Sequence, residues 1–223
     1  MPKKLSDRLS LIASFVPKGK SVCDIGCDHG YLAAYLYLNK ISENVTAADI
    51  RQSPLENAER NLEKLGAIGV KTVLCDGLSG IPRKDADTVI IAGMGGDVIS
   101  GILTRCDYIR DSEITLILQP MTAADVLRRY LAEEGFSVEA ENAVFDNGKI
   151  YSVMKCRFSK PYTIDSVRER IGILTPCCGD NRTYIKKQAD ICLKCSEDLF
   201  EADRCSAEKY RKTADELLKI LNT

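Results

Sequence analysis

The chain has 223 residues, of which 45% are hydrophobic and 28% are charged, and its formal net charge is -1 at pH 7. This composition is that of an ordinary globular protein, and it excludes a disordered chain or one drawn to nucleic acid by its overall charge. No segment approaches the roughly 20 apolar residues of a membrane-spanning helix, so no membrane contact is expected. Because the N-terminus is polar and basic, without the apolar core of a secretory signal, we expect a cytoplasmic protein.

The first predicted element is a helix that ends at Pro17 and Gly19. Its apolar face consists of Leu5, Leu9, Ile12 and Val16. The basic residues Lys3, Lys4 and Arg8 lie beside this face. Such charges usually form a solvated surface, but a basic helix close to a binding site can also hold a phosphate. Arg8 is therefore a candidate substrate-binding residue.

The stretch Ser21–Tyr31 predicts a buried strand, a glycine turn and the start of a helix. The strand carries Asp24 near its end, and Gly26 and Gly30 follow it. This geometry lets backbone N–H groups and a helix N-terminus come close to a ligand. A dinucleotide fingerprint would need a glycine where Asp28 stands. The pattern Asp-x-Gly-x-x-x-Gly resembles instead the first motif of the methyltransferases that depend on S-adenosylmethionine.

Further strands are expected at residues 44–50, 70–75, 86–92 and 114–118. Asp49 and Ile50 end the first of them, at the position where a carboxylate can accept both hydroxyl groups of a ribose. Asp76 and Gly77 follow the next strand, where a carboxylate could accept the exocyclic amine of an adenine. The alternatives are an ordinary aspartate at a strand end and a simple Asp-Gly turn.

The last two of these strands lead into segments rich in glycine or containing proline. The block Gly93-Met94-Gly95-Gly96 follows the strand at 86–92, and Gln119-Pro120 follows the strand at 114–118. Glycine directly after a buried strand indicates that the backbone comes very close to a neighbour. That neighbour can be a ligand, or the block can form a tight turn between strand and helix, and the two interpretations are compatible.

Residues 136–145 and 150–158 predict an antiparallel pair of strands around the turn Asp146-Asn147-Gly148-Lys149. Before them, strands and helices alternate, which predicts an α/β fold with a Rossmann-like, mostly parallel sheet. The closing pair would add one antiparallel strand. Ligands of such sheets bind at the carboxyl ends of the strands, where the residues named above lie.

From Asn181 onward the chain has an unbroken polar helical pattern. Two apolar seams with heptad spacing fall out of phase between Glu201 and Ser206. We therefore expect an antiparallel helical hairpin of coiled-coil type, with Ser206 as the cap of its second helix. Its basic residues are mixed with acidic ones, which is typical of a solvated face, although the same face could grip a long RNA.

The ten cysteines are expected to stay reduced, because nothing in the sequence suggests export. Four of them, Cys177, Cys178, Cys192 and Cys195, could supply thiolates to zinc. However, Cys192 and Cys195 lie on the apolar face of a predicted helix, and the paired spacing of a zinc knuckle is absent. Packing as small hydrophobic residues is the favoured interpretation, and no metal is expected.

Three segments, in this order and spacing, resemble the bacterial tRNA adenine-N1 methyltransferases that modify position 22 in the D-loop. The segments are Asp24–Leu32, Ala92–Gly96 and Leu118–Pro120. The resemblance implies a class I methyltransferase domain at residues 1–160 and a helical coiled-coil hairpin at 161–223. It also implies S-adenosylmethionine as the cofactor, tRNA as the partner, and methyl transfer to N1 of an adenine. We expect a monomer or a weak dimer.

The resemblance assigns site residues by position. On the cofactor side it places Asp24, Gly26, Asp49, Ile50, Asp76, Gly77 and Gly93. On the substrate side it places Met94, Gly95, Gly96, Gln119 and Pro120.

The chemistry of the implied reaction suggests further candidates. N1 of adenine has an in-plane lone pair, so the protein must align the reactants and exclude water, and it needs no obligatory general base. The methylated base is cationic, and a carboxylate or another acceptor near N6 would stabilise the developing charge or help to remove a proton. Asp28 is the first candidate for this role and His29 the second, while Tyr31 could stack on the base or pack on the cofactor. The simpler alternatives are a helix N-cap for Asp28, a turn residue for His29 and helix packing for Tyr31.

Two other functions fit the same residues. A methyltransferase of a small metabolite would share the sheet and the cofactor site, but it would not need a basic tail. A non-catalytic RNA-binding protein on this fold is the second, although intact Asp24, Gly26 and Asp49 argue against it. A nicotinamide oxidoreductase is the weakest alternative, because Asp28 interrupts the glycine fingerprint.

Overall fold

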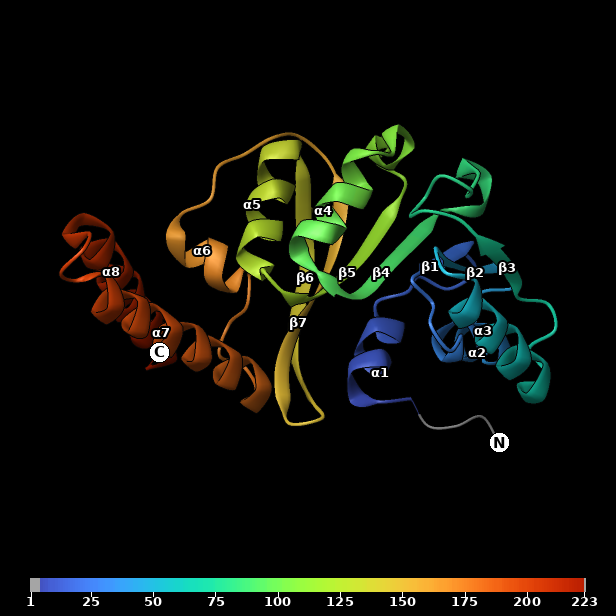
Figure 1. The fold of residues 1–223 in the computed structure, drawn as a ribbon, viewed down its shortest axis with the longest axis horizontal. Coiled ribbons are helices and arrows are strands. Elements are labelled where there is room, and N and C mark those ends of the chain that lie inside the picture. Colours follow the sequence, from blue (N-terminus) through green and yellow to red (C-terminus); the bar gives the residue numbers. More distant parts are fainter. Residues whose placement is uncertain (1–4, 223) are drawn as a thin grey trace.

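The computed structural model describes residues 5–222, so Lys3 and Lys4 lie outside the described part of the chain. A seven-stranded sheet with the order β3-β2-β1-β4-β5-β7-β6 forms the centre of the molecule (Figure 1). Its strands are β1 (Val22–Ile25), β2 (Val45–Asp49), β3 (Lys71–Leu74), β4 (Thr88–Gly95), β5 (Thr115–Thr122), β6 (Phe136–Asp146) and β7 (Lys149–Phe158). Every strand expected from the sequence is present, with ends that differ by a few residues.

The strand pairing confirms the predicted fold. β1 to β5 pair in parallel, whereas β7 is antiparallel to both β5 and β6. The β6–β7 turn is tight, and Asn147 and Gly148 have φ angles of 48° and 76°. Both residue types tolerate positive φ, which a two-residue hairpin turn needs to match the twist of its strands. Asn147 and Gly148 thus set the register that pairs Asp146 with Lys149.

Helices cover both faces of the sheet. One face is covered by α4 (Gly96–Thr104) and α5 (Ala124–Glu134). The other is covered by α1 (Asp7–Ser14), α2 (Tyr31–Leu38) and α3 (Gln52–Leu65). Because successive side chains of a strand point to opposite faces, Ile91 and Leu116 pack in the first layer, and Ile90 and Ile117 pack in the second. Strands buried on both faces explain the continuous apolar runs in the sequence.

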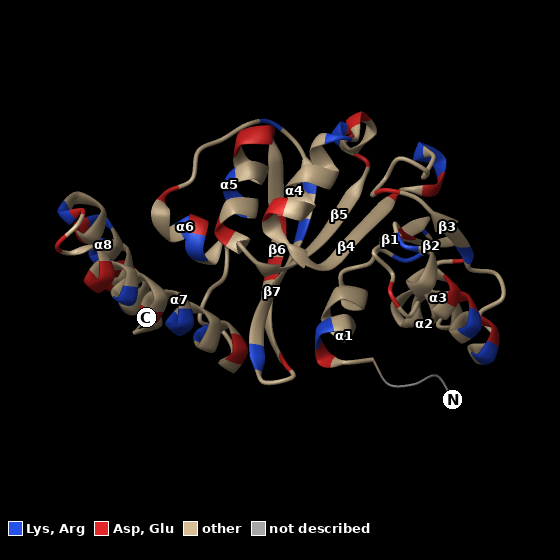
Figure 2. Ribbon diagram, in the orientation of Figure 1, with Lys and Arg blue, Asp and Glu red and all other residues tan. Residues whose placement is uncertain are grey.

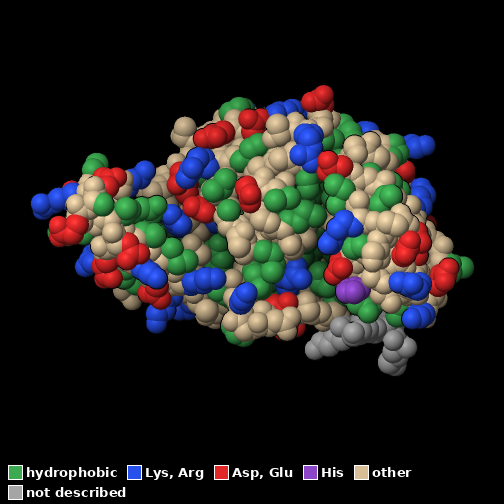
Figure 3. Space-filling model, in the orientation of Figure 1, with side chains coloured by type: hydrophobic (Ala, Val, Ile, Leu, Met, Phe, Trp, Pro, Cys, Tyr) green, Lys and Arg blue, Asp and Glu red, His purple; other side chains and the backbone are tan. Residues whose placement is uncertain are grey.

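The tail forms the expected antiparallel hairpin from α7 (Gly179–Leu199) and α8 (Arg204–Leu221). Lysine and arginine alternate with acidic residues over it in Figure 2, and Figure 3 shows the same mixture at the surface. The side chain of Asp203, rather than Ser206, caps α8 by accepting a hydrogen bond from the backbone N–H of Ser206 (3.1 Å). The predicted cap is therefore wrong, because a carboxylate three residues earlier takes that place. A short helix, α6 (Ser166–Ile171), precedes the hairpin and was not expected.

The start of α7 covers the outer edge of β6. The side chains of Asn181 and Asp180 accept hydrogen bonds from the backbone N–H groups of Ala143 (2.8 Å) and Phe145 (3.1 Å). Apolar residues of α7 also pack with Ala143 and Ile150 in one buried cluster. The hairpin thus bonds two N–H groups of the sheet edge. The domain boundary expected near residue 160 stays a prediction.

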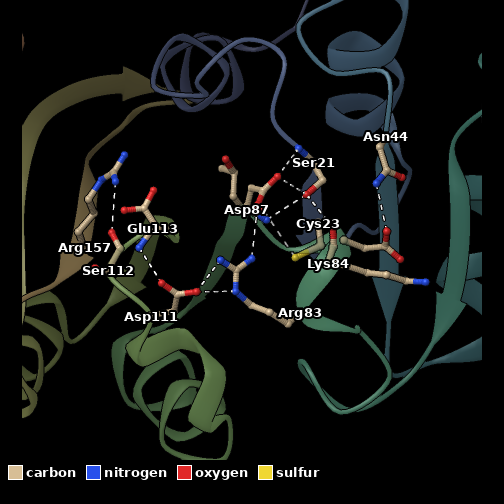
Figure 4. A network of polar contacts seen from close by, with 12 residues as sticks. Ser21, Cys23, Asn44, Arg83, Lys84, Asp87, Asp111, Ser112, Glu113 and Arg157 are labelled. Carbon is tan, nitrogen blue, oxygen red and sulfur yellow. Dashed lines mark hydrogen bonds and ion pairs between the residues drawn. The ribbon is translucent and has the colours of Figure 1, made fainter.

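A polar network joins the amino ends of the central strands (Figure 4). The backbone N–H and the hydroxyl of Ser21, before β1, donate to the carboxylate of Asp87, before β4 (3.2 and 2.9 Å). Arg83, in the short helix η1 (Arg83–Asp85), pairs with Asp87 (3.4 Å) and with Asp111 (2.6 Å). Asp111 follows the short helix η2 (Asp107–Arg110). These contacts fix the strands at the end opposite to the candidate residues.

Gly96 marks a close approach between α4 and α5. A Cβ atom at Gly96 would overlap the backbone carbonyl of Ala123. We expect Gly96→Ala to lower the free energy of unfolding by about 2 kcal/mol or more, because backbone atoms cannot give way. Urea denaturation measures this change. The control is Gly101→Ala in the same helix, where the added atom would lie 3.7 Å from the end of the Arg105 side chain. That control should gain roughly 0.5–1 kcal/mol, and equal effects at both sites would contradict the close approach.

Candidate functional site

A cavity of about 1000 Å³ lies at the carboxyl ends of the parallel strands. Its walls come from the segments that follow β1, β2, β3 and β4, from α1, and from the β6–β7 turn. The charged residues of the lining are six aspartates and three arginines. They are Asp24, Asp28, Asp49, Asp76, Asp97 and Asp146, and Arg8, Arg51 and Arg105. An excess of negative charge in a cleft favours ligands that carry cationic groups.

The glycine turn after β1 brings the backbone against this cavity. Gly26 has a φ angle of 76°, and its N–H donates to the carbonyl of Ala48 (2.8 Å). A Cβ atom at Gly26 would overlap only the terminal methyl group of Met94, which is the flexible end of its side chain. Gly30, with a φ angle of 69°, stands at the N-cap of α2. The turn therefore presents bare backbone to a ligand.

Asp24 is a buried carboxylate in the cavity wall. It is 4% exposed, and burial raises its pKa to about 7, although Arg8 opposes the shift and Asp49 adds to it. At this pKa, protonated and ionised forms coexist near neutral pH. A cationic ligand beside Asp24 would favour the ionised form.

Two more carboxylates lie at the ends of the neighbouring strands. Asp49, at the end of β2, is 5% exposed and accepts a hydrogen bond from the backbone N–H of Arg51 (2.9 Å). Asp76, after β3, pairs with Arg105 (3.1 Å). Ile50 adds an apolar surface that is 61% exposed. All seven residues predicted for the cofactor side line this cavity.

The residues predicted for the substrate side divide into two groups. Arg8 and Met94 line the cavity, whereas Gly95, Gly96, Gln119 and Pro120 do not. Gln119 is fully buried, and its Oε1 accepts hydrogen bonds from Arg8 (2.7 Å) and from the backbone N–H of Gly93 (3.1 Å). Gln119 thus supports the cavity wall from behind.

Arg8 points from α1 into the cavity. Its Nη1 donates to Gln119, and its Nε lies 3.6 Å from Oδ2 of Asp146. The sequence pattern predicted a cation on the helix surface that could hold a phosphate. The two partners, Gln119 in β5 and Asp146 at the end of β6, lie far away in the sequence and draw the side chain inward instead.

Asp28, His29 and Tyr31 line the cavity together beside the glycine turn. Nε2 of His29 lies 3.5 Å from Oδ2 of Asp28, and the rings of His29 and Tyr31 are 5.8 Å apart. The capping alternative for Asp28 is wrong, because Gly30 occupies the N-cap and no side chain caps α2. Asp28 has a φ angle of 48° and a side chain that is 65% exposed. Positive φ is uncommon for a residue other than glycine, although aspartate and asparagine adopt it more readily than most.

Several other lining residues had no motif that could reveal them. They are Ser6, Leu9, Asp97, Met121 and Asn147, among others. Asp97 directly follows the glycine block, which is the one available indication. Asn147 reaches the cavity only because the β6–β7 turn lies close to α1 in space.

Within residues 5–222, no group of three or more histidine, cysteine or acidic residues could hold a metal ion. Cys192 is buried on the α7–α8 seam, Cys195 is half-buried, and Cys177 and Cys178 are exposed before α7. Over the same described residues, no helix is long and apolar enough to span a membrane.

A family model described as a methyltransferase domain matches residues 5–154. The chain belongs to the methyltransferase family. This methyltransferase is 36% identical over 152 residues to the tRNA (adenine(22)-N(1))-methyltransferase of Bacillus subtilis. The match covers 68% of the chain and 64% of that relative, so the chain spans slightly less than two thirds of the relative's length.

Solved structures resemble this methyltransferase along nearly its whole length. The Bacillus subtilis m1A22 tRNA methyltransferase TrmK has a TM-score of 0.83 and 29% identity, and the match covers 99% of both chains. A Streptococcus pneumoniae protein, provisionally named a tRNA (m1A22) methyltransferase and solved with S-adenosyl-L-methionine, has a TM-score of 0.84 and 27% identity. That match covers 96% of this chain and 100% of the other. The resemblance drawn from the three sequence segments is confirmed.

Proposed function

We propose that this methyltransferase transfers a methyl group from S-adenosylmethionine to N1 of adenine 22 in tRNA. The observation that carries the proposal is the row of carboxylates at three adjacent strand ends: Asp24 in β1, Asp49 in β2 and Asp76 after β3. The cofactor carries an ammonium group, a ribose diol and an exocyclic amine. Each of these is a hydrogen-bond donor, and carboxylates are strong acceptors for them.

The rest of the cavity fits the other parts of the cofactor. Ile50, Val98 and Ile102 offer apolar surface to a purine ring, and Gly26 leaves backbone exposed to the amino-acid end. When bound, the cofactor supplies an activated methyl group. The residues of the chain have to hold that group in line with N1 of the adenine and keep water away from it.

The residues beside the glycine turn suit the target base. Methylation at N1 makes the adenine cationic, and Asp28 supplies a carboxylate on the cavity lining to stabilise that charge. His29 is the alternative for this role. Tyr31 offers a ring on which a flipped-out base can stack. The excess of aspartates in the cavity supports the same charge preference.

A tRNA substrate is favoured over a small metabolite by the surface of the tail. Lys186, Lys187 and Lys194 line a shallow groove on α7 together with one acidic residue, Asp190. Basic groups of this kind contact phosphates of an RNA backbone. A small metabolite bound in the cavity would not contact these lysines, because none of them lines the cavity. A cytoplasmic location belongs to the same proposal, and a monomer or weak dimer stays a prediction.

The test is a methylation assay with two RNA transcripts. The protein is incubated with labelled S-adenosylmethionine and an unmodified tRNA, and the RNA is digested to nucleosides. We expect 1-methyladenosine as the labelled product. The matched control is the same tRNA with guanine at position 22, which should stay unlabelled. Label in neither transcript, or equal label in both, would contradict the proposal.

An Asp28→Asn variant tests the role of the carboxylate. Asparagine tolerates positive φ as aspartate does, so we expect the free energy of unfolding to change by less than about 0.5 kcal/mol. The rate of methyl transfer should fall by on the order of 10- to 100-fold, because the charge that stabilises the cationic base is lost. Single-turnover assays and urea denaturation measure the two quantities. A full rate in this variant would remove Asp28 from the chemistry.

A further inference from the structure

A single side-chain amide reaches the cavity. Among the residues that the structure describes, Asn147 is the only asparagine or glutamine on the lining. It is exposed, and its amide makes no hydrogen bond to another residue of 5–222. Both groups of the Gln119 amide, by contrast, are bonded within the protein. Asn147 therefore offers a ligand one NH₂ donor and one carbonyl acceptor.

The β6–β7 turn, which carries Asn147, is held from two sides. Oδ2 of Asp146 lies 3.6 Å from Nε of Arg8, and apolar side chains of β6 pack with those of α1 in one buried cluster. On the other side, the backbone N–H of Phe145 donates to Asp180 of α7 (3.1 Å). The amide of Asn147 is thus presented to the cavity from a fixed support, as the recognition of one particular ligand group requires.

The turn reaches the cavity from the side away from the predicted nucleoside end of the cofactor. Asp49 and Asp76 follow β2 and β3, close to one edge of the sheet, whereas β6 is the strand at the other edge. Figure 1 shows the turn beside α1, with β2 and β3 on the far side of that helix. The cavity, at about 1000 Å³, is at the upper end of the range for a site that holds one small ligand. A base that enters beside the cofactor would therefore have room next to the turn.

Methylation at N1 restricts how a protein can recognise an adenine. N1 lies on the Watson–Crick edge and must stay open to the methyl group, which leaves N6 and N7 on the other edge for recognition. A side-chain amide matches these two groups, because its carbonyl accepts from N6–H while its NH₂ donates to N7. A carboxylate can accept from N6 but has no donor for N7. Among the described lining residues, only Asn147 has a side chain that can make both bonds side by side.

We propose that Asn147 is a specificity-determining residue, which binds N6 and N7 of the target adenine while N1 faces the methyl group. This inference rests on the proposed function, since it takes an adenine as the target. Asn147 selects and orients the base and takes no part in the transfer itself. The role proposed for Asp28 is compatible with it, because N6 carries a second hydrogen on the side of N1.

Two tRNA transcripts test the inference. One has adenosine at position 22, and the other has 7-deazaadenosine, in which a C–H group replaces N7 but N1 and N6 are kept. The measured quantity is the ratio of their single-turnover methylation rates at subsaturating RNA, adenosine over 7-deazaadenosine. We expect this ratio to be on the order of 10-fold larger for the unaltered protein than for Asn147→Gly, because the amide that senses N7 is gone. Comparing two proteins cancels the effect of the altered ring on the reactivity of N1.

A second variant keeps the size of the side chain. Glycine and aspartate both accept the positive φ of position 147, so neither substitution should disturb the turn. Asn147→Asp replaces the donor by a second acceptor, whose oxygen would face the lone pair of N7. Its ratio of the two rates should therefore be lower than that of Asn147→Gly.

Asn142→Asp is the matched control, since it makes the same chemical change on the same strand. Asn142 is exposed on β6 and does not line the cavity. Its ratio of the two rates should equal that of the unaltered protein. Calorimetry should give one affinity for S-adenosylhomocysteine in all these proteins, because no cofactor contact is removed. The melting temperature of each variant shows that it is folded.

The outcomes separate the inference from the proposed function. If Asn147→Gly keeps the ratio of the unaltered protein, Asn147 does not sense N7 and the inference fails. If Asn147→Gly weakens the binding of S-adenosylhomocysteine, Asn147 contacts the cofactor rather than the base, and the inference also fails. If the unaltered protein methylates neither transcript, the proposed function itself is wrong.

Discussion

Asp24→Asn is expected to stabilise the unliganded protein at neutral pH and to weaken its binding of S-adenosylhomocysteine. The pKa of Asp24 is about 7 in the folded protein, against an ordinary value of 3.8. When folding raises the pKa of a carboxyl group, its favourable contribution is complete below the unfolded value and is lost as the pH rises through the folded value. Asparagine has no charge at any of these pH values, so the variant escapes this loss. The gain at neutral pH is at most roughly 4 kcal/mol, since each pKa unit corresponds to about 1.4 kcal/mol.

Urea denaturation at pH 5 and pH 8 measures this effect, and the gain should be larger at the higher pH. The control is Asp76→Asn, which removes an exposed carboxylate from the same cavity and should change the free energy of unfolding by less than about 1 kcal/mol. Calorimetry should show that binding to the unaltered protein strengthens as the pH rises toward 7 and Asp24 ionises. Asp24→Asn should bind on the order of 100-fold more weakly, with no such pH dependence. A gain in stability that is equal at both pH values would contradict the raised pKa of Asp24 in the folded protein.

Arg128→Met should be among the most destabilising single substitutions in the chain. Arg128, on α5, is 2% exposed, and its Nη2 lies 2.6 Å from Oε1 of the fully buried Glu141 side chain. It also donates to the hydroxyl groups of Ser152 and Tyr184 and to two backbone carbonyls of α6. Burial alone would lower the pKa of Arg128, but Glu141 and Tyr184 raise it above its ordinary value. Removing one partner leaves a buried carboxylate unpaired, which costs about 3–5 kcal/mol.

The neighbouring Arg129 provides the control. It pairs with Glu169 at 3.1 Å, but the two side chains are 47% and 23% exposed. Arg129→Met should therefore change the free energy of unfolding by less than about 1 kcal/mol. A double variant, Arg128→Met with Glu141→Leu, should recover most of the lost stability, because it removes both buried charges. Equal losses for Arg128→Met and Arg129→Met in urea denaturation would contradict the role of the buried pair.

The sequence predicted the parts of this molecule that local patterns control. Apolar runs located the strands, and the rule that ligands bind at their carboxyl ends placed Asp24, Asp49 and Asp76 together at one edge of the sheet. The pair Asn147-Gly148 predicted the hairpin through its tolerance of positive φ.

Local sequence patterns do not predict the direction of a side chain when that direction depends on partners far away in the sequence. Nothing near Arg8 in the sequence indicates that Gln119 and Asp146 will enclose it. Gln119 was expected on the substrate side, but its amide is used entirely within the protein wall. The cap of α8 was misplaced because Asp203 and Ser206 are both good capping residues, and only the path of the turn selects between them.

We expect the contact between α7 and the edge of β6 to protect the protein against self-association as well. A strand at a sheet edge with open N–H groups pairs readily with strands of other molecules. Asn181 and Asp180 occupy those groups at Ala143 and Phe145. A chain cut after residue 160 would expose them together with the apolar surface beneath the hairpin, and we expect it to aggregate. The proposed role of the α7 lysines in RNA binding is therefore best tested by reversing their charges in the intact chain.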